Sequence, residues 1–138
     1  MSRVVVTGGS IEVIVNQMAR DIPTEMASRA YRASNELRNS ALEVLRGQRS
    51  GRMYGGHQAS APGEPPAVWS GTFRLSWQPR TYIETPTFKS TIETDVGYAG
   101  ILENGTPGGQ MAPRPHHELI KEKALPEITR IYGEPYDL

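Results

Sequence analysis

The clearest pattern of hydrophobic and polar positions lies between Asp21 and Gly47, and it predicts a long helix. Small or apolar side chains recur there every three or four residues, which is the spacing of one helical face. These positions are Met26, Ala30, Ala33, Leu37, Ala41 and Val44. Asp21 suits the N-cap, Pro23 the first turn and Gly47 the C-terminal cap. The other faces carry glutamates and arginines such as Arg29 and Arg32, which predicts a solvated surface or contact with another subunit.

Four shorter runs predict antiparallel strands. Residues 4–6 and 11–15 are β-branched and are separated by two glycines, which suit the turn of a hairpin. Residues 77–84 and 87–96 are rich in threonine, isoleucine and aromatic side chains, and Pro86 separates them. Alternation along the last run places one set of side chains on a buried face and leaves the other face wet. The buried set is Phe88, Ser90, Ile92, Thr94 and Val96.

Three helical segments complete the prediction. Residues 70–75 form a short turn that Ser70 can cap, and residues 98–104 form another turn, which the glycine after it closes. A final helix over residues 116–132 carries apolar side chains on one side, and Pro126 within it predicts a kink or a break. The apolar positions are Leu119, Ile120, Ala124, Ile128 and Ile131.

The predicted fold class is α+β, with a small, mainly antiparallel sheet packed against one long helix and a shorter C-terminal helix. Residues 1–138 are expected to form a single domain, with an N-terminal hairpin in residues 1–16. Residues 47–66 are expected to be a flexible loop, because closely spaced glycines and prolines disfavour regular structure. These are Gly47, Gly51, Gly55, Gly56, Pro62, Gly63, Pro65 and Pro66.

Composition narrows the classes of function. Fifteen basic side chains balance fifteen acidic ones, so the net charge gives no affinity for nucleic acid or membranes. The absence of cysteine excludes disulfides and thiolate metal sites. No apolar run approaches the roughly 20 residues of a membrane span, and the N-terminal run is too short for a signal peptide. A hydrophobic share of 37%, with 14 glycines and 11 prolines, favours stabilisation by neighbouring subunits.

Candidate chemistry is sparse, and we expect no enzyme activity, no cofactor and no metal. No serine lies in a nucleophile elbow, and no glycine-rich segment has P-loop spacing. His116 and His117 are adjacent, and successive residues of a helix point about 100° apart, which makes them a poor metal site. Glu103 beside Gly105 has no second carboxylate placed by a motif for acid–base chemistry.

Nucleic-acid binding is the alternative from another functional class. Six arginines in and after the long helix are candidates for a stripe that contacts phosphates, and Tyr31 and Tyr54 lie among them. These arginines are Arg29, Arg32, Arg38, Arg46, Arg49 and Arg52. Glutamates at positions 25, 36 and 43 dilute their charge, and no known nucleic-acid-binding motif accompanies them.

Two motifs connect the sequence to a family. The first joins residues 62–66, Pro-Gly-Glu-Pro-Pro, to residues 70–76, Ser-Gly-Thr-Phe-Arg-Leu-Ser. The second joins residues 98–106, Tyr-Ala-Gly-Ile-Leu-Glu-Asn-Gly-Thr, to residues 111–115, Met-Ala-Pro-Arg-Pro, before the last helix. Their order and spacing resemble the neck or tail-completion proteins of long-tailed bacteriophages, also called minor tail components. The resemblance covers about residues 22–130.

Members of that family typically have a Gly-x-Leu-Arg-x-Ser turn, a hydrophobic-Glu-x-Gly-Thr segment and an Ala-Arg-Pro-Phe entry to the last helix. This chain departs from the pattern at Phe73, where leucine is usual, and at His116, where the family has phenylalanine. The N-terminal hairpin is a further departure. The departures bear on the last helix and the N-terminus.

The resemblance implies a structural virion protein of the head-to-tail connector. It implies a homo-oligomeric ring, expected to be a hexamer, between the head-completion or stopper protein and the tail terminator or tail tube. Genome DNA is then expected to pass through the lumen without sequence-specific contact. The protein is expected in the host cytoplasm during assembly and afterwards in the neck of the virion. A tail-terminator role is the nearest alternative.

The same motifs supply candidate residues for interaction or architecture. Gly71 and Gly105 permit backbone turns that a side chain obstructs. Tyr98 and Trp69 are amphipathic and suit interfaces. Both Arg74 and Glu103 are expected in short helices, where they can form ion pairs within or between subunits. The full set is Trp69, Gly71, Arg74, Tyr98, Glu103, Gly105 and Arg114.

Overall fold

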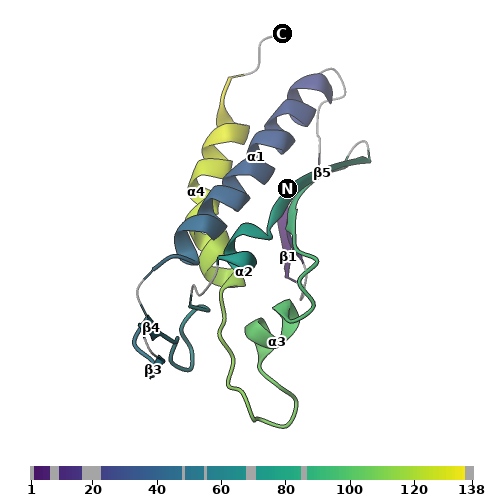
Figure 1. Cartoon of the computed structure of the whole chain (residues 1–138). Helices are drawn as coiled ribbons and strands as arrows, with labels where there is room; N and C mark the ends of the chain where they lie inside the picture. The colour runs from purple at the N-terminus through teal and green to yellow at the C-terminus, as the bar shows by residue number, and fades with distance from the viewer. Residues whose placement is uncertain are drawn as a thin grey trace.

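The computed structural model describes residues 2–6, 10–16, 23–47, 49–54, 56–67, 71–84 and 87–135 (Figure 1). Their helices and strands, in chain order, are β1 (Ser2–Val6), β2 (Ser10–Asn16), α1 (Pro23–Val44), β3 (Met53–Tyr54), β4 (His57–Gln58), α2 (Thr72–Leu75), β5 (Gln78–Glu84), β6 (Thr87–Glu93), α3 (Ala99–Asn104) and α4 (His117–Gly133). The sequence predicted this succession, apart from β3 and β4. The proposed caps Asp21 and Ser70 and the candidate Trp69 lie outside the described residues.

Four of the strands form an antiparallel sheet in the order β1-β2-β6-β5. The central pair places Val13 opposite Ser90, and Ser90 in turn lies opposite Thr81 of β5. Phe88, Ser90 and Ile92 are fully buried on the face that α1 covers, as the alternation predicted. The α+β prediction is therefore confirmed.

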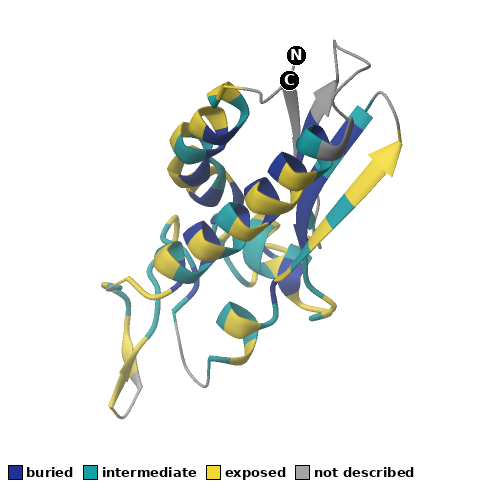
Figure 2. Cartoon of the chain, turned by 90° about the horizontal axis from the view of Figure 1, so that it is seen from above, coloured by how far each residue is buried: buried dark blue, intermediate teal, exposed yellow. Residues whose placement is uncertain are grey.

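Helix α1 contacts β5 and β6 with one side and α4 with another. Figure 2 shows its buried positions turned towards the sheet and α4. Ala30, Ala33, Leu37 and Ala41 of the predicted face have no exposed surface. The small side chains let β6 approach the backbone of α1 closely. At this approach the Ser90 hydroxyl donates to the carbonyl oxygen of Ala30 at 2.7 Å.

Helix α4 packs along α1 through the predicted apolar side. Ile120, Ala124, Ile128 and Ile131 are buried, but Leu119 is 44% exposed and does not belong to that side. The helix continues through Pro126 without a break. Proline removes one backbone N–H donor, and its position on the exposed surface leaves the packed side of α4 unaffected.

Arg29 corrects the prediction of a solvated charged face on α1. Its side chain is buried, with an exposed fraction of 3%, and reaches the C-terminal end of α4. The guanidinium donates to the carbonyl oxygens of Ile131 at 2.8 Å and Glu134 at 2.7 Å. It also donates to those of Tyr132 at 3.2 Å and Pro135 at 3.0 Å. Because the last carbonyls of a helix lack partners within the helix, Arg29 acts as the C-terminal cap of α4.

Within residues 47–66 the structure contains two short strands that the sequence did not predict, and the rest of the described part of that segment has no helix or strand. Strands β3 and β4 form a small antiparallel hairpin. The N–H of Gly51, which precedes β3, donates to the carbonyl oxygen of Ala59, which follows β4, so the two flanking segments are also connected. The Glu64 carboxylate accepts the N–H groups of Ser50 at 3.0 Å and Ala61 at 2.7 Å. These bonds lower the pKa of Glu64 to about 2. A carboxylate therefore organises a segment whose composition alone indicates a loop.

Candidate functional site

The two motifs meet at one pocket, which is lined by residues from just after the end of α1, from α2 and α3, and from the loops that adjoin them. Figure 1 shows α2 and α3 on the side of the molecule where α1 ends and α4 begins. Its volume is about 370 Å³. The first motif supplies Pro66, Gly71, Thr72, Phe73 and Arg74, the second supplies Tyr98, Leu102, Met111 and Arg114, and the remaining wall consists of Leu45, Ala59, Ser60 and Ala67. We call these thirteen residues the motif pocket. Four candidates from the sequence therefore lie together, although the chain separates them widely.

Backbone hydrogen bonds hold the second motif in place. The N–H of Arg114 donates to the Leu102 carbonyl at 2.7 Å, which ties the entry of α4 to α3. The N–H of Gly63 donates to the Pro113 carbonyl at 3.1 Å, so the first proline-rich segment is tied to the second. The two segments that carry the family resemblance are therefore joined directly.

Two glycines make these turns possible. Gly71 and Gly105 have φ angles of +84° and +77°, which side chains other than hydrogen rarely allow. A Cβ at Gly105 would also lie 2.7 Å from the Met111 carbonyl oxygen. Gly105 therefore has two reasons to be glycine, whereas a Cβ at Gly71 would meet only Leu75 Cδ1, at an ordinary contact distance of 3.8 Å, so only the backbone conformation favours glycine there.

The two arginines of the motif pocket form hydrogen bonds within the chain and keep further donors without a partner among the described residues. Arg74 donates from Nε to the Leu42 carbonyl at 2.9 Å, near the end of α1. Arg114 donates from Nε to the Ser60 hydroxyl at 2.8 Å and from Nη1 to the Ala112 carbonyl at 2.8 Å. Arg74 and Glu103 form no ion pair with each other, so the pairing considered from the sequence is absent within the described chain.

Tyr98 lies at the mouth of the motif pocket with 46% of its surface exposed. Its ring contacts that of Phe73 at a centroid distance of 5.8 Å. Tyr98 therefore presents an aromatic surface to solvent while it is anchored on one side, which is the geometry of an interface residue.

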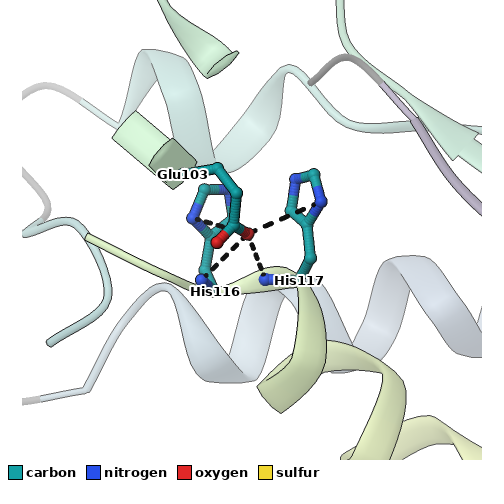
Figure 3. Close-up of side chains that lie close together, drawn as sticks. All are labelled: Glu103, His116 and His117. Atoms are coloured by element: carbon teal, nitrogen blue, oxygen red, sulfur yellow. Dashed lines mark hydrogen bonds and ion pairs between the residues drawn. The ribbon is translucent and has the colours of Figure 1, made fainter. Parts of the chain in front are cut away.

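Glu103 connects α3 to the start of α4, as Figure 3 shows. Its Oε1 accepts the backbone N–H of His117 at 2.7 Å and that of His116 at 3.2 Å. The first N–H groups of a helix have no partner within the helix, so this carboxylate caps α4 from a distance. The side chains of His116 and His117 are buried beside it.

The two histidines belong to an aromatic cluster that the sequence did not predict. His116 contacts Phe73 edge-on at 5.4 Å, and His117 contacts Trp77 at 5.8 Å between ring centroids. His116 Nδ1 bonds to the Arg114 carbonyl at 2.9 Å. Burial lowers the pKa of both imidazoles, that of His117 to about 4, so both are neutral at neutral pH.

The geometric reason for excluding a metal from this pair is wrong. His116 has φ −143° and precedes the first helical residue, so the 100° rotation between successive helical residues does not apply. One potential ligand atom from each of Glu103, His116 and His117 lies within 4.8 Å of the others. The sequence shows Glu103 in the motif that precedes the two histidines, but only the folded structure brings its carboxylate next to their rings.

Several of the arginines considered for nucleic-acid binding bond to groups of the same chain. Arg29 is buried, Arg38 donates to the Trp77 carbonyl at 3.0 Å, and Arg49 donates to the Pro65 carbonyl at 2.7 Å. Arg32 forms a bidentate pair with Glu134 at 2.7 and 2.8 Å. Most of the predicted stripe is therefore occupied by contacts within the chain.

In the described part, no helix has the length and hydrophobicity needed to cross a membrane.

Comparisons of the chain with protein families, with curated proteins and with solved structures find no match.

Proposed function

We propose that this chain is a structural protein of the neck of a long-tailed bacteriophage. In the proposal, six copies form a ring that joins the head-completion complex to the tail terminator or tail tube. Genome DNA passes through the ring without base-specific contact. The observation that carries the proposal is the convergence of both family-like motifs on one open pocket, with Tyr98 half-exposed at its mouth.

The sheet offers a second argument for assembly through edges. Its order leaves β1 and β5 as the two outer strands, each paired on one side only among the described residues. Tyr82 and Ile83 of β5 are 38% and 43% exposed, which is unusual for apolar groups on an edge strand. Two different edges on one subunit suit the head-to-tail contacts that generate rings.

The motif pocket has the chemistry of a docking surface. Within the described chain, the Nη groups of Arg74 and the Nη2 group of Arg114 have no hydrogen-bond partner. They lie beside the apolar walls formed by Phe73 and Leu102. Guanidinium groups above an apolar floor suit a segment of a neighbouring protein that combines a carboxylate with aliphatic side chains.

A role as tail terminator uses the same surfaces and remains the nearest alternative within the neck. A nucleic-acid-binding accessory protein is less favoured, because the arginines that this reading needs are bonded to carbonyls and carboxylates of the same chain.

Tyr98→Lys tests the proposed docking surface, and Tyr31→Lys is the matched control. Both tyrosines are exposed, at 46% and 57%, but Tyr31 lies on α1 outside the motif pocket. Each variant is supplied to a phage that lacks the chain, and particles with attached tails are counted by electron microscopy. We expect Tyr98→Lys to lower their number about tenfold or more, because the loss of an aromatic hot-spot side chain from an interface costs about 2 kcal/mol or more, and about 1.4 kcal/mol already corresponds to tenfold.

The control is expected to restore wild-type numbers, and both variants are expected to keep the wild-type melting temperature. Full restoration by Tyr98→Lys would contradict the assignment of the motif pocket to an interface. Equal losses in both variants would contradict the distinction between the pocket and the surface of α1.

A further inference from the structure

The side chains of Glu103, His116 and His117 meet at the junction between α3 and α4. Glu103 Oε1 lies 3.5 Å from His117 Nδ1 and 3.8 Å from His116 Nδ1. Four-coordinate zinc holds its ligands at about 2.1 Å, which sets neighbouring ligand atoms roughly 3.4 Å apart. One potential ligand atom from each of the three residues lies within 4.8 Å of the others, so side-chain rotations that close these separations to about 3.4 Å bring the three atoms to the geometry of a shared ion.

These imidazoles are buried without the partners that buried polar groups normally have. The exposed fractions of the His116 and His117 side chains are 0% and 1%. Neither ring nitrogen of His117 has a hydrogen-bond partner, and Nε2 of His116 has none among the described residues. An unpaired polar group in an interior costs free energy, so such groups are rare unless an ion, water or ligand satisfies them.

The contacts of each group also suit metal binding. Both imidazole rings lie against the Glu103 carboxylate and are shielded from solvent. Nδ1 of His116 already bonds to the Arg114 carbonyl, which is the usual outer contact of a histidine that binds a metal through Nε2. The Glu103 carboxylate uses Oε1 for the two backbone N–H groups, and no hydrogen bond occupies Oε2 in the described chain.

We propose that Glu103, His116 and His117 bind one divalent transition-metal ion, with zinc as the ion that best suits two imidazoles and a carboxylate. Three protein ligands leave a fourth position for water. Imidazole-rich sites favour zinc and copper over magnesium and calcium, which prefer sets of oxygen ligands. The ion would fasten α3 to the first turn of α4 and thereby fix the second motif. This inference is independent of the neck proposal.

The test titrates the full chain, purified without a histidine tag and stripped with a chelator. Zinc binding is measured by isothermal titration calorimetry, and Co²⁺ serves as a spectroscopic probe through the intense visible absorption of its four-coordinate complexes. We expect one ion per chain, four-coordinate cobalt bands, and a melting temperature that rises by about 5 °C or more at saturating zinc.

Two variants remove ligands while they keep the fold. Glu103→Gln retains an oxygen that can accept the N–H groups at the start of α4 but loses the negative charge. His116→Phe retains a ring in the aromatic cluster beside Phe73. Each variant is expected to weaken zinc binding at least about tenfold while the melting temperature without metal changes little.

His57→Ala is the matched control, since His57 is the remaining histidine of the chain and lies exposed on the β3–β4 hairpin. It is expected to bind zinc as the wild type does. The proposal is overturned if the wild type binds no zinc at micromolar concentrations. It is equally overturned if the loss occurs in His57→Ala while Glu103→Gln and His116→Phe keep full binding.

Discussion

Replacement of Arg29 by methionine is expected to lower the free energy of unfolding by about 3–5 kcal/mol. Methionine fills much of the same buried volume, but it cannot donate to the four carbonyl oxygens that receive the guanidinium at the end of α4. Those carbonyls would stay largely screened from water. The measurement is urea unfolding followed by circular dichroism, which gives the difference in free energy between variant and wild type.

Arg32→Met is the matched control one helical turn further along α1. The Arg32 guanidinium also reaches the end of α4, where it pairs with Glu134 in a bidentate contact. That pair is partly exposed to solvent, so its removal is expected to cost less than about 1 kcal/mol. Equal losses in the two variants would contradict the role of Arg29 as the buried cap.

Replacement of Trp77 by alanine is expected to cost about 3–5 kcal/mol of stability. Trp77 has no exposed surface and lies in the main core cluster with Leu37 and Ile92. Its ring also contacts that of Phe73, in the first motif, and that of His116, the residue that follows the second motif. The alanine variant therefore leaves a cavity at the point where the two motifs meet.

Trp77→Phe separates packing from hydrogen bonding at this position. The indole N–H of Trp77 has no hydrogen-bond partner among the described residues, so phenylalanine loses volume but no polar contact. We expect a loss below about 2 kcal/mol, again from urea unfolding. A phenylalanine variant as unstable as the alanine variant would show that the indole N–H has a stabilising partner.

The fold was predictable where local patterns determine it. Ala30, Leu37 and Ala41 share one helical face, and the alternation at Phe88, Ser90 and Ile92 gives the buried side of β6. Such patterns depend only on the repeat of the backbone, so they can be read without tertiary information. Thr91 departs from the alternation, because its buried hydroxyl bonds to Glu93 on the side of the sheet away from α1.

Contacts between distant segments account for what the sequence did not predict. Charge suggested that Arg29 is exposed, but its partners lie more than 100 residues away at the end of α4. Glycine and proline content predicted a loop after α1, but Glu64 gathers backbone N–H groups and stabilises the hairpin beside it. Neither partner set is visible in a local pattern.

In the candidate site, too, local motifs identify residues, whereas contacts between distant segments determine what those residues bind. The motifs identified Gly71, Arg74, Tyr98 and Arg114, and the fold places all four around the motif pocket. Glu103 was identified too, but its contacts with the start of α4 depend on how α3 packs against that helix. His116 and His117 were rejected as ligands because a helix was assumed to include both of them. A helix boundary that differs by one residue changes the direction of a side chain, and hence the chemistry available.

The motif residues therefore combine structural contacts with exposed surface. Arg114 and Gly105 fix the loop that leads into α4, whereas Tyr98 presents an aromatic ring to solvent. An assembly protein needs both properties, because a rigid pocket loses less conformational entropy when a neighbour docks.

The most direct test of the neck proposal is electron microscopy of particles from a phage in which the gene for this chain is deleted. The account predicts DNA-filled heads and complete tails that remain separate, with attachment restored when the wild-type chain is supplied in the same cells. Infectious particles with firmly attached tails in the absence of the chain would contradict it.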